Sequence, residues 1–493
     1  MREGPNVRRL GTACLAALVL AGCTAGPDYR RPEVTAPPGW RLGATAASET
    51  PDAAWWEQFG DPDLTRLVRD ALANSYDLKA AAARVDQALA LYGAARAGLF
   101  PQVNADAAAT RSRASRDTLQ GQAIPAGHQV YGALDLDLSA SYEIDLWGRV
   151  RRATEAARAG LLASEEARRT VVMTLVSSVA EAYIQLRALD EQLEIARRTL
   201  DSRREALRLQ KARFEGGVAA ETDLRQAESQ YESAASVLPQ VERAIGQQEN
   251  LIKVLAGAAP GPVERGLPIG QLQFPEIPAG LPADLLQRRP DLRQAEQELV
   301  AANADIGVAR AAYFPRIALT GLLGLQSAQL SNLFNDASVA WSIGAGAVQP
   351  LIDGGAISSQ VKLAQARERE ALYSYRRAVI GAFQEVEDAL IARSTLERQR
   401  AEQAKNVAAL RRFRDLAEAR YREGATIYLE VATAEQSLFD AELALSGVQA
   451  QLFQSYANLY KALGGGWVDR AAARAGADTL SDAAPAAASG GAR

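Results

Sequence analysis

The chain has 493 residues, of which 48% are apolar and 23% charged, and its formal net charge is −4. This mild charge balance excludes a strongly basic nucleic-acid-binding protein. The chain has one histidine, two cysteines that do not form a CxxC pair, and no GxxxxGK(S/T) phosphate loop, so we predict no enzyme activity and no metal site.

The N-terminus has the pattern of a secretory signal. Three arginines precede a short apolar run, residues 10–20, which is shorter than the roughly 20 residues of a transmembrane helix. The run is followed by Ala-Gly-Cys ending at Cys23, which resembles a bacterial lipoprotein signal. We predict a signal peptide over 1–22, a covalent lipid on Cys23 as the one non-protein group, and an extended lipid-anchored segment over 23–61.

Sequence motifs recur at long spacing along the chain. The pair Phe100-Pro101 returns as Phe314-Pro315, and Ala212-Arg213-Phe214 returns as Ala419-Arg420-Tyr421. This spacing far exceeds the roughly 20–50 residues of a solenoid repeat and indicates a domain-scale duplication. The predicted divisions are a first repeat over 62–257, a linker over 258–280, a second repeat over 281–465, and a disordered tail over 466–493.

Each repeat is predicted to contain long helices. The expected helices are 62–98, 149–215 and 220–256 in the first repeat, and 283–312, 355–422 and 426–463 in the second. Asn74 and Pro290 are candidate start signals. In the helix 149–215, apolar residues alternate in steps of four and three, a coiled-coil seam. Its members are Leu175, Val179, Ala182, Leu186, Leu189, Leu193, Ala196 and Leu200. The second repeat carries a weaker seam at Phe383, Val386 and Leu390.

Two β-like runs in each repeat separate the first helix from the long one. The runs are 102–112, 134–146, 317–326 and 338–350. In 134–146 apolar residues alternate strictly with polar ones, as in an outer-membrane strand, although a half-buried strand of a soluble sheet alternates in the same way. The carboxylates of this run are Asp135, Asp137, Glu143 and Asp145, and they would make a cation-preferring lumen if their face points inward.

Four strands cannot close a barrel that faces lipid, because the smallest such barrels have about eight strands. Open edges in hydrocarbon would leave backbone groups unpaired. Two chains would supply eight strands around a filled lumen, whereas three would supply twelve around an open pore. We expect a homotrimer with a twelve-stranded barrel.

Three stretches carry a family resemblance. They are Gly26-Pro27-Asp28-Tyr29 after the lipoprotein start, Trp55-Trp56 followed by Asp61-Pro62, and the run from Leu281 to Pro315. With them, the chain from Cys23 to about Gly465 resembles the outer membrane factors of the TolC and OprM type, in the NodT-like lipoprotein branch.

The resemblance implies a mainly α-helical protein with transmembrane β-strands, in which a trimeric barrel in the bacterial outer membrane continues into a long α-helical coiled-coil barrel across the periplasm. The function implied is that of a passive exit duct in a tripartite efflux system. A periplasmic adaptor would open it, and an inner-membrane pump of the resistance-nodulation-division class would power it. A type I secretion conduit and a non-conducting structural envelope lipoprotein remain alternatives, and the cargo is left open.

The resemblance also implies site residues at the periplasmic tips. The adaptor-contacting tips would be Gly216, Gly217, Val218, Gly424, Ala425 and Thr426. A gate would involve a link between Asp223 and Tyr421, and an acidic ring at Glu430, although each residue has a purely structural alternative. Thr426 stands where TolC itself has arginine, and Thr433 where aspartate is common, so a salt-bridge lock is left open.

Overall fold

A computed structural model describes residues 24–42, 54–125, 129–275, 282 and 285–465. The predicted signal peptide, Cys23 and the predicted tail lie outside the described residues. The chain divides into two compact units. Of the described residues, the first unit contains those within 24–33, 85–164 and 295–375, and the second contains those within 34–84, 165–294 and 376–465.

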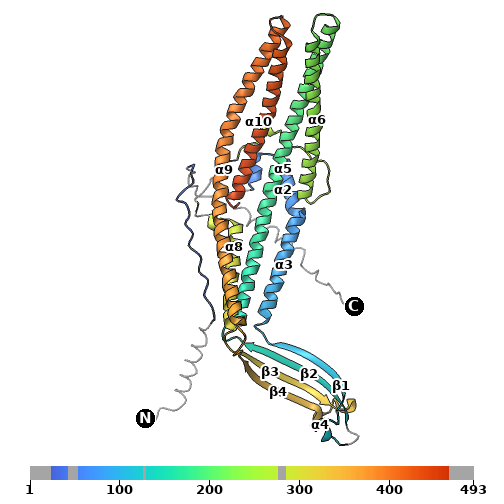
Figure 1. The fold of residues 1–493 in the computed structure, drawn as a ribbon, viewed down its shortest axis with the longest axis vertical. Coiled ribbons are helices and arrows are strands. Elements are labelled where there is room, and N and C mark those ends of the chain that lie inside the picture. The colour runs from blue at the N-terminus through green and yellow to red at the C-terminus, as the bar shows by residue number, and fades with distance from the viewer. Residues whose placement is uncertain (1–23, 43–53, 126–128, 276–281, 283–284, 466–493) are drawn as a thin grey trace, which may run out of the picture. The chain divides into compact units, whose positions relative to one another are not determined.

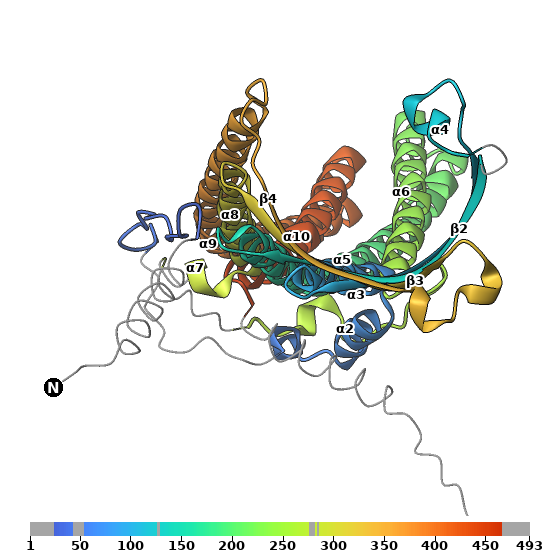
Figure 2. The ribbon, with the colours of Figure 1, turned by 90° about the horizontal axis from the view of Figure 1, so that it is seen from below.

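The first unit contains an antiparallel sheet with the strand order β1-β2-β3-β4 (Figure 1). Figure 2 shows that this sheet is curved. Its strands are β1 (Gln102–Arg113), β2 (Val130–Ile144), β3 (Arg316–Ser327) and β4 (Val339–Val348). Each strand overlaps a predicted run, although β2 begins at Val130, before the predicted start at residue 134. Short helices lie between the paired strands, namely α4 (Leu119–Gln122) before β2, and η4 (Leu330–Asn332) and η5 (Asp336–Ser338) before β4.

The predicted end of the second strand at residue 146 is wrong. The strand ends at Ile144 because the Asp145 carboxylate accepts hydrogen bonds from the backbone N–H groups of Val150 (3.1 Å) and Arg151 (2.9 Å). These donors lie in the first turn of α5 (Arg149–Glu215), where backbone N–H groups lack a helical partner. Asp145 therefore belongs to the start of the helix and not to the strand.

The register of the sheet gathers apolar side chains on one face. Leu138 lies opposite Ala105 of β1 and Leu323 of β3, and Leu323 lies opposite Trp341 of β4. Residues directly opposite each other in an antiparallel sheet share a face. Leu138, Leu323 and Trp341 are more than half exposed. The apolar face therefore runs across all four strands without cover in the single chain.

The long helices follow the prediction closely. The predicted first repeat contains α5 and α6 (Glu221–Leu255), and the predicted second repeat contains α9 (Ala356–Arg422) and α10 (Tyr428–Ala462). Corresponding helices have equal lengths, 67 residues for α5 and α9 and 35 for α6 and α10. Among the described residues, no helix has the length and hydropathy needed to span a membrane.

Both predicted helices that precede the strands are broken. The segment 62–98 forms α2 (Pro62–Asn74) and α3 (Tyr76–Ala97), because Ser75 leaves helical geometry at ψ 129°. Asn74 thus ends a helix, and its prediction as a start signal is wrong. The segment 283–312 contains α7 (Leu285–Arg288) and α8 (Pro290–Ala311). Pro290 is the first residue of α8, as predicted, because proline lacks the N–H that an interior position would need.

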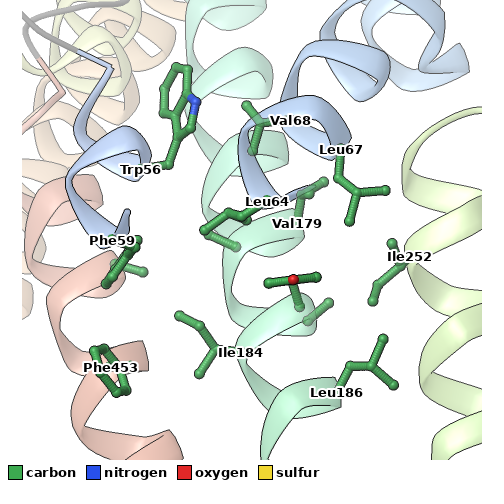
Figure 3. Close-up of a cluster of buried hydrophobic side chains, with 14 of the residues drawn as sticks. Trp56, Phe59, Leu64, Leu67, Val68, Val179, Ile184, Leu186, Ile252 and Phe453 are labelled. Carbon is green, nitrogen blue, oxygen red and sulfur yellow. The ribbon is translucent and has the colours of Figure 1, made fainter. Parts of the chain in front are cut away.

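The core of the second unit lies where α5 meets the segment before α2 (Figure 3). Trp55 and Phe59 belong to the 3-10 helix η1 (Trp55–Phe59); Trp55 stacks on Tyr460 of α10 (4.9 Å between ring centroids), and Phe59 packs edge-on against Phe453 (5.9 Å). The predicted seam residues of α5 are buried, with Leu193 partly so, and those of α9 are buried as well. The predicted seam residues are thus buried. The prediction of an extended segment over 23–61 is wrong for its last part, because Trp55–Phe59 form η1 and contribute core residues.

Candidate functional site

The predicted tips are the two reversals between antiparallel helices in the second unit. Gly217 (φ 71°) and Gly424 (φ 74°) have left-handed backbone geometry, which glycine adopts without strain. The N–H of Val218 donates to the carbonyl of Arg213 (2.9 Å), and the N–H of Ala425 donates to that of Arg420 (2.8 Å). Both helices therefore end in the same glycine-based motif.

The tip surfaces are apolar at two positions. Val218, which the sequence predicts as a tip residue, is 70% exposed, and Ile427, which it does not, is 66% exposed. Gly216 and Thr426 flank these residues within the same reversals. An exposed aliphatic side chain on each tip suits contact with another protein.

Glu430 is held by its own hairpin. Its carboxylate pairs with the Arg420 guanidinium (3.0 Å) and accepts a hydrogen bond from the Thr426 hydroxyl. The other Arg420 nitrogen donates to the carbonyl of Ala425 (3.4 Å). Arg420, six residues before Thr426, therefore supplies a cation for the Glu430 carboxylate within the same chain.

Tyr421 joins α5 to α9, but through residues other than the predicted partner. Its hydroxyl accepts a hydrogen bond from the Gln210 amide (2.7 Å), and the Arg213 guanidinium lies over its ring, 5.0 Å from the centroid. Within the described part of the chain, no hydrogen bond joins Tyr421 to Asp223. Asp223 lies in the first turn of α6, where its own N–H donates to Ala220.

Sequence reasoning missed Gln210, Arg213 and Arg420. A signal was available, because Arg213 and Arg420 occupy the same position of the repeated Ala-Arg-aromatic motif. The two arginines nevertheless have different partners, the Tyr421 ring for Arg213 and the Glu430 carboxylate for Arg420.

A charged cavity of about 300 Å³ lies further along the same helices. Glu442 of α10, almost fully buried, pairs with Arg198 of α5 (2.8 Å) and Arg411 of α9 (2.7 Å). Arg203, also on α5, is buried and donates to the carbonyl of Gln230 on α6 (2.8 Å) and to the Gln436 amide on α10 (2.9 Å). These contacts join α5 to α6 and α10, and α9 to α10.

The predicted row of acidic residues on β2 is divided. Asp135 and Asp137 lie on the face opposite the apolar one, and Asp137 is in register with Asp106 of β1. Glu143 pairs with Arg149 (2.8 Å) and Arg316 (2.9 Å). Asp145, outside the strand, pairs with Arg151 (3.3 Å). Arginines thus pair with the carboxylates of Glu143 and Asp145. Asp135 and Asp137 are the two aspartates of the predicted row that lie within the strand, on its polar face.

No group of three or more metal-binding side chains occurs among the described residues. Cys23, the predicted lipid site, precedes the first described residue, Thr24. The described N-terminal segment is held on the first unit, where the N–H of Ala25 donates to the carbonyl of Trp147 (2.8 Å) and the Asn303 amide donates to the carbonyl of Pro27 (3.0 Å).

Comparisons with known proteins agree on one family. The profile of a family described as "Outer membrane efflux protein" matches residues 67–258 and 281–465. "Probable efflux pump outer membrane protein TtgC" of Pseudomonas putida is 37% identical over 470 residues, covering 94% of this chain and 96% of that protein. "Cation efflux system protein CusC" of Escherichia coli is 34% identical over 456 residues, covering 92% and 97%.

Solved structures are similar over nearly the same span. The outer-membrane channel OprN superposes with a TM-score of 0.82 at 31% identity, covering 90% of this chain and all of that one. The open state of the MtrE outer membrane channel of Neisseria gonorrhoeae gives 0.81 at 32% identity, covering 90% and 99%.

Proposed function

The chain belongs to the outer membrane efflux protein family, and from this premise we propose that three copies form a passive exit duct, opened by a periplasmic adaptor and powered by an inner-membrane pump. The protein is an outer-membrane component of an efflux system. The observation that carries the finer proposal is the uncovered apolar face of the four-stranded sheet.

The sheet supports assembly because it is incomplete in one chain. Strands β1 and β4 each have one neighbour, so each leaves one edge of backbone groups unpaired. Such edges are costly in hydrocarbon. Three chains would join edge to edge into twelve strands, with the apolar face toward lipid and Asp135 and Asp137 toward the lumen.

Equal element lengths support the proposed duplication. Strands β1 and β3 each have 12 residues, and helices α3 and α8 each have 22. We retain the two repeats over 62–257 and 281–465, joined by a linker over 258–280, with a lipid-bearing N-terminus at Cys23.

The names of the relatives support a pump as a partner, and they favour efflux over type I secretion or a structural spacer. They do not select a cargo, because similar proteins are named for toluene efflux, cation efflux and pyoverdine export. The proposed partner is an inner-membrane pump of the resistance-nodulation-division class.

For the gate, we propose that Tyr421 holds the two tips together and that Glu430 contributes an acidic ring at the aperture. Tyr421 ties α9 to α5 through Gln210 and Arg213, and Glu430 is fixed by Arg420. Among the described residues, no arginine of the α5–α6 hairpin pairs with Asp223, so we propose that its carboxylate faces a neighbouring chain. Adaptor contact at Val218 and Ile427 would loosen these ties and let the tips move apart.

The test is single-channel conductance of the full-length protein in planar bilayers. We expect small closed-state currents for the wild type and larger ones for Asp223→Ala combined with Tyr421→Phe. Tyr373→Phe, an exposed tyrosine on the same helix α9, is the matched control and should behave as wild type. Closed-state currents unchanged in the double variant would overturn the gate, and the complete absence of conductance would overturn the duct.

A further inference from the structure

A cavity of about 400 Å³ lies in the first unit, where α8 leads into β3. Its walls include Tyr313 and Phe314 at the end of α8, Val361 on α9, and the N-terminal residues Ala25 and Gly26. These groups are mostly apolar. Arg310 and Gln365 supply the polar atoms of the wall.

Arg310 is the feature that distinguishes this cavity. It lies in the last turn of α8 and is partly buried. Within the part of the chain that the structure describes, its guanidinium makes no hydrogen bond or ion pair. A partly buried, permanently charged group beside apolar walls calls for an anion with a hydrocarbon portion.

The cavity adjoins the start of the apolar sheet face. Trp147 stacks on Phe314 with 4.5 Å between ring centroids, and its indole N–H donates to the carbonyl of Pro315 (2.9 Å), one residue before β3 begins. Tyr313 and Phe314 are both about half exposed. Aromatic side chains at the end of an apolar surface are typical of the boundary between hydrocarbon and lipid headgroups.

We propose that this cavity binds an anionic glycerophospholipid, with an acyl chain against Tyr313, Phe314 and Val361 and the phosphate on Arg310. Charge complementarity at Arg310 and continuity with the apolar sheet face carry the proposal, which rests on the proposed placement of the sheet in the outer membrane. A bidentate guanidinium–phosphate contact at this boundary would hold one lipid in place. The site lies against the N-terminal segment at Ala25 and so would also fasten that segment.

The experiment uses the full-length protein in detergent, with phosphatidylglycerol that carries a photoactivatable group on one acyl chain. We expect crosslinks to peptides containing Tyr313–Phe314 and Val361–Gln365. Arg310→Gln should lower the yield roughly fivefold or more, because it removes the charged contact. Diacylglycerol with the same photoactivatable chain, lacking the phosphate, should label the wild type as weakly as phosphatidylglycerol labels this variant.

Arg96→Gln is the matched control. Arg96 occupies the same position of the first repeat, but it is exposed on the last turn of α3. Its substitution should leave labelling unchanged. Gln365→Trp should fill the cavity and lower the labelling yield. Because Gln365 is less buried than Val361, the protein should stay folded.

Several outcomes are decisive. Equal labelling of the wild type and Arg310→Gln would overturn the proposal, as would crosslinks spread evenly over the sheet. Labelling that rises strongly in Cys23→Ser would show that the chain's own lipid occupies the cavity, and it would overturn the proposal as well. Conductance of the same samples tests the duct separately, since a conducting protein without labelling would contradict only the lipid site.

Discussion

The hydroxyl of Tyr183 donates a hydrogen bond of 2.9 Å to the Asp61 carboxylate, and both side chains are buried. The same carboxylate accepts the N–H of Leu267 (2.9 Å) and caps α2 through the N–H of Asp63 (2.8 Å). The Tyr183 oxygen in turn accepts the N–H of Gly266 (2.9 Å). One carboxylate thus joins the start of α2 to α5 and to the segment that contains Leu267.

Asp61→Ala should therefore destabilise the second unit by about 3 kcal/mol, because it removes a helix cap and leaves buried donors unpaired. Asp61→Asn, which keeps a carbonyl acceptor, should cost about 1 kcal/mol. Thermal unfolding of the detergent-solubilised protein measures both. Asp70→Ala on the exposed surface of α2 is the control, expected within about 0.5 kcal/mol of wild type; an equally small effect of Asp61→Ala would contradict the assignment.

The stability of the helical unit should depend on pH through Glu435. Burial raises the pKa of the Glu435 carboxyl above its ordinary 4.5, although the positive charge of Arg203 opposes the shift. The arginine Arg414 also opposes it, and the charge of Glu418 adds to it. The unfolded chain therefore loses this proton at a lower pH than the folded chain does. Ionisation of Glu435 thus lowers the free energy of unfolding above the ordinary pKa, and this effect vanishes below it.

Glu435→Gln should consequently raise the melting temperature relative to wild type at about pH 8, and the difference should shrink toward about pH 4. Glu442→Gln is the contrasting variant, because it weakens the ion pairs with Arg198 and Arg411 and should lower the melting temperature near neutrality. A constant difference between Glu435→Gln and wild type across this range would count against the burial effect.

The N-terminal segment should detach when one glycine is substituted. A side chain at Gly307 would place its Cβ 2.7 Å from the carbonyl oxygen of Ala25 and 2.8 Å from Cγ of Arg152. Gly307→Ala should cost about 1–3 kcal/mol locally and speed proteolysis near this segment. Gly160→Ala meets nothing within 4 Å and is the matched helical control. Equal cleavage rates in both variants would refute the close contact.

The two faces of the sheet should differ in their tolerance of charge. Leu323 lies on the apolar face opposite Trp341, and its neighbour Leu322 lies on the other face opposite Ser342. If the apolar face meets lipid, Leu323→Arg should cost about 2–4 kcal/mol of insertion free energy, and Leu322→Arg much less. The fraction of each variant recovered in the outer membrane measures the difference. Equal recovery of the two variants would contradict the assignment of the apolar face to lipid.

Local patterns were sufficient to predict the regular elements. The coiled-coil seam of α5, the strict alternation in β2 and the glycines of both tips each encode their structure over a few neighbouring residues. The helix break at Ser75 was not predicted, because it lies where the chain contacts a residue that is far away in the sequence. An added Cβ at Gly257 would lie 2.4 Å from the carbonyl oxygen of Asn74.

The sequence by itself determined the element order, the alternating face of β2, the reversals at Gly217 and Gly424, and the family, because hydrophobic period, glycine geometry and shared motifs are properties of short segments. Only the tertiary structure decided which charges meet. Arg213 and Arg420 share one motif position, yet one packs on Tyr421 and the other pairs with Glu430. Side chains far apart in the chain compete for the same partners, and that competition is resolved by packing in three dimensions.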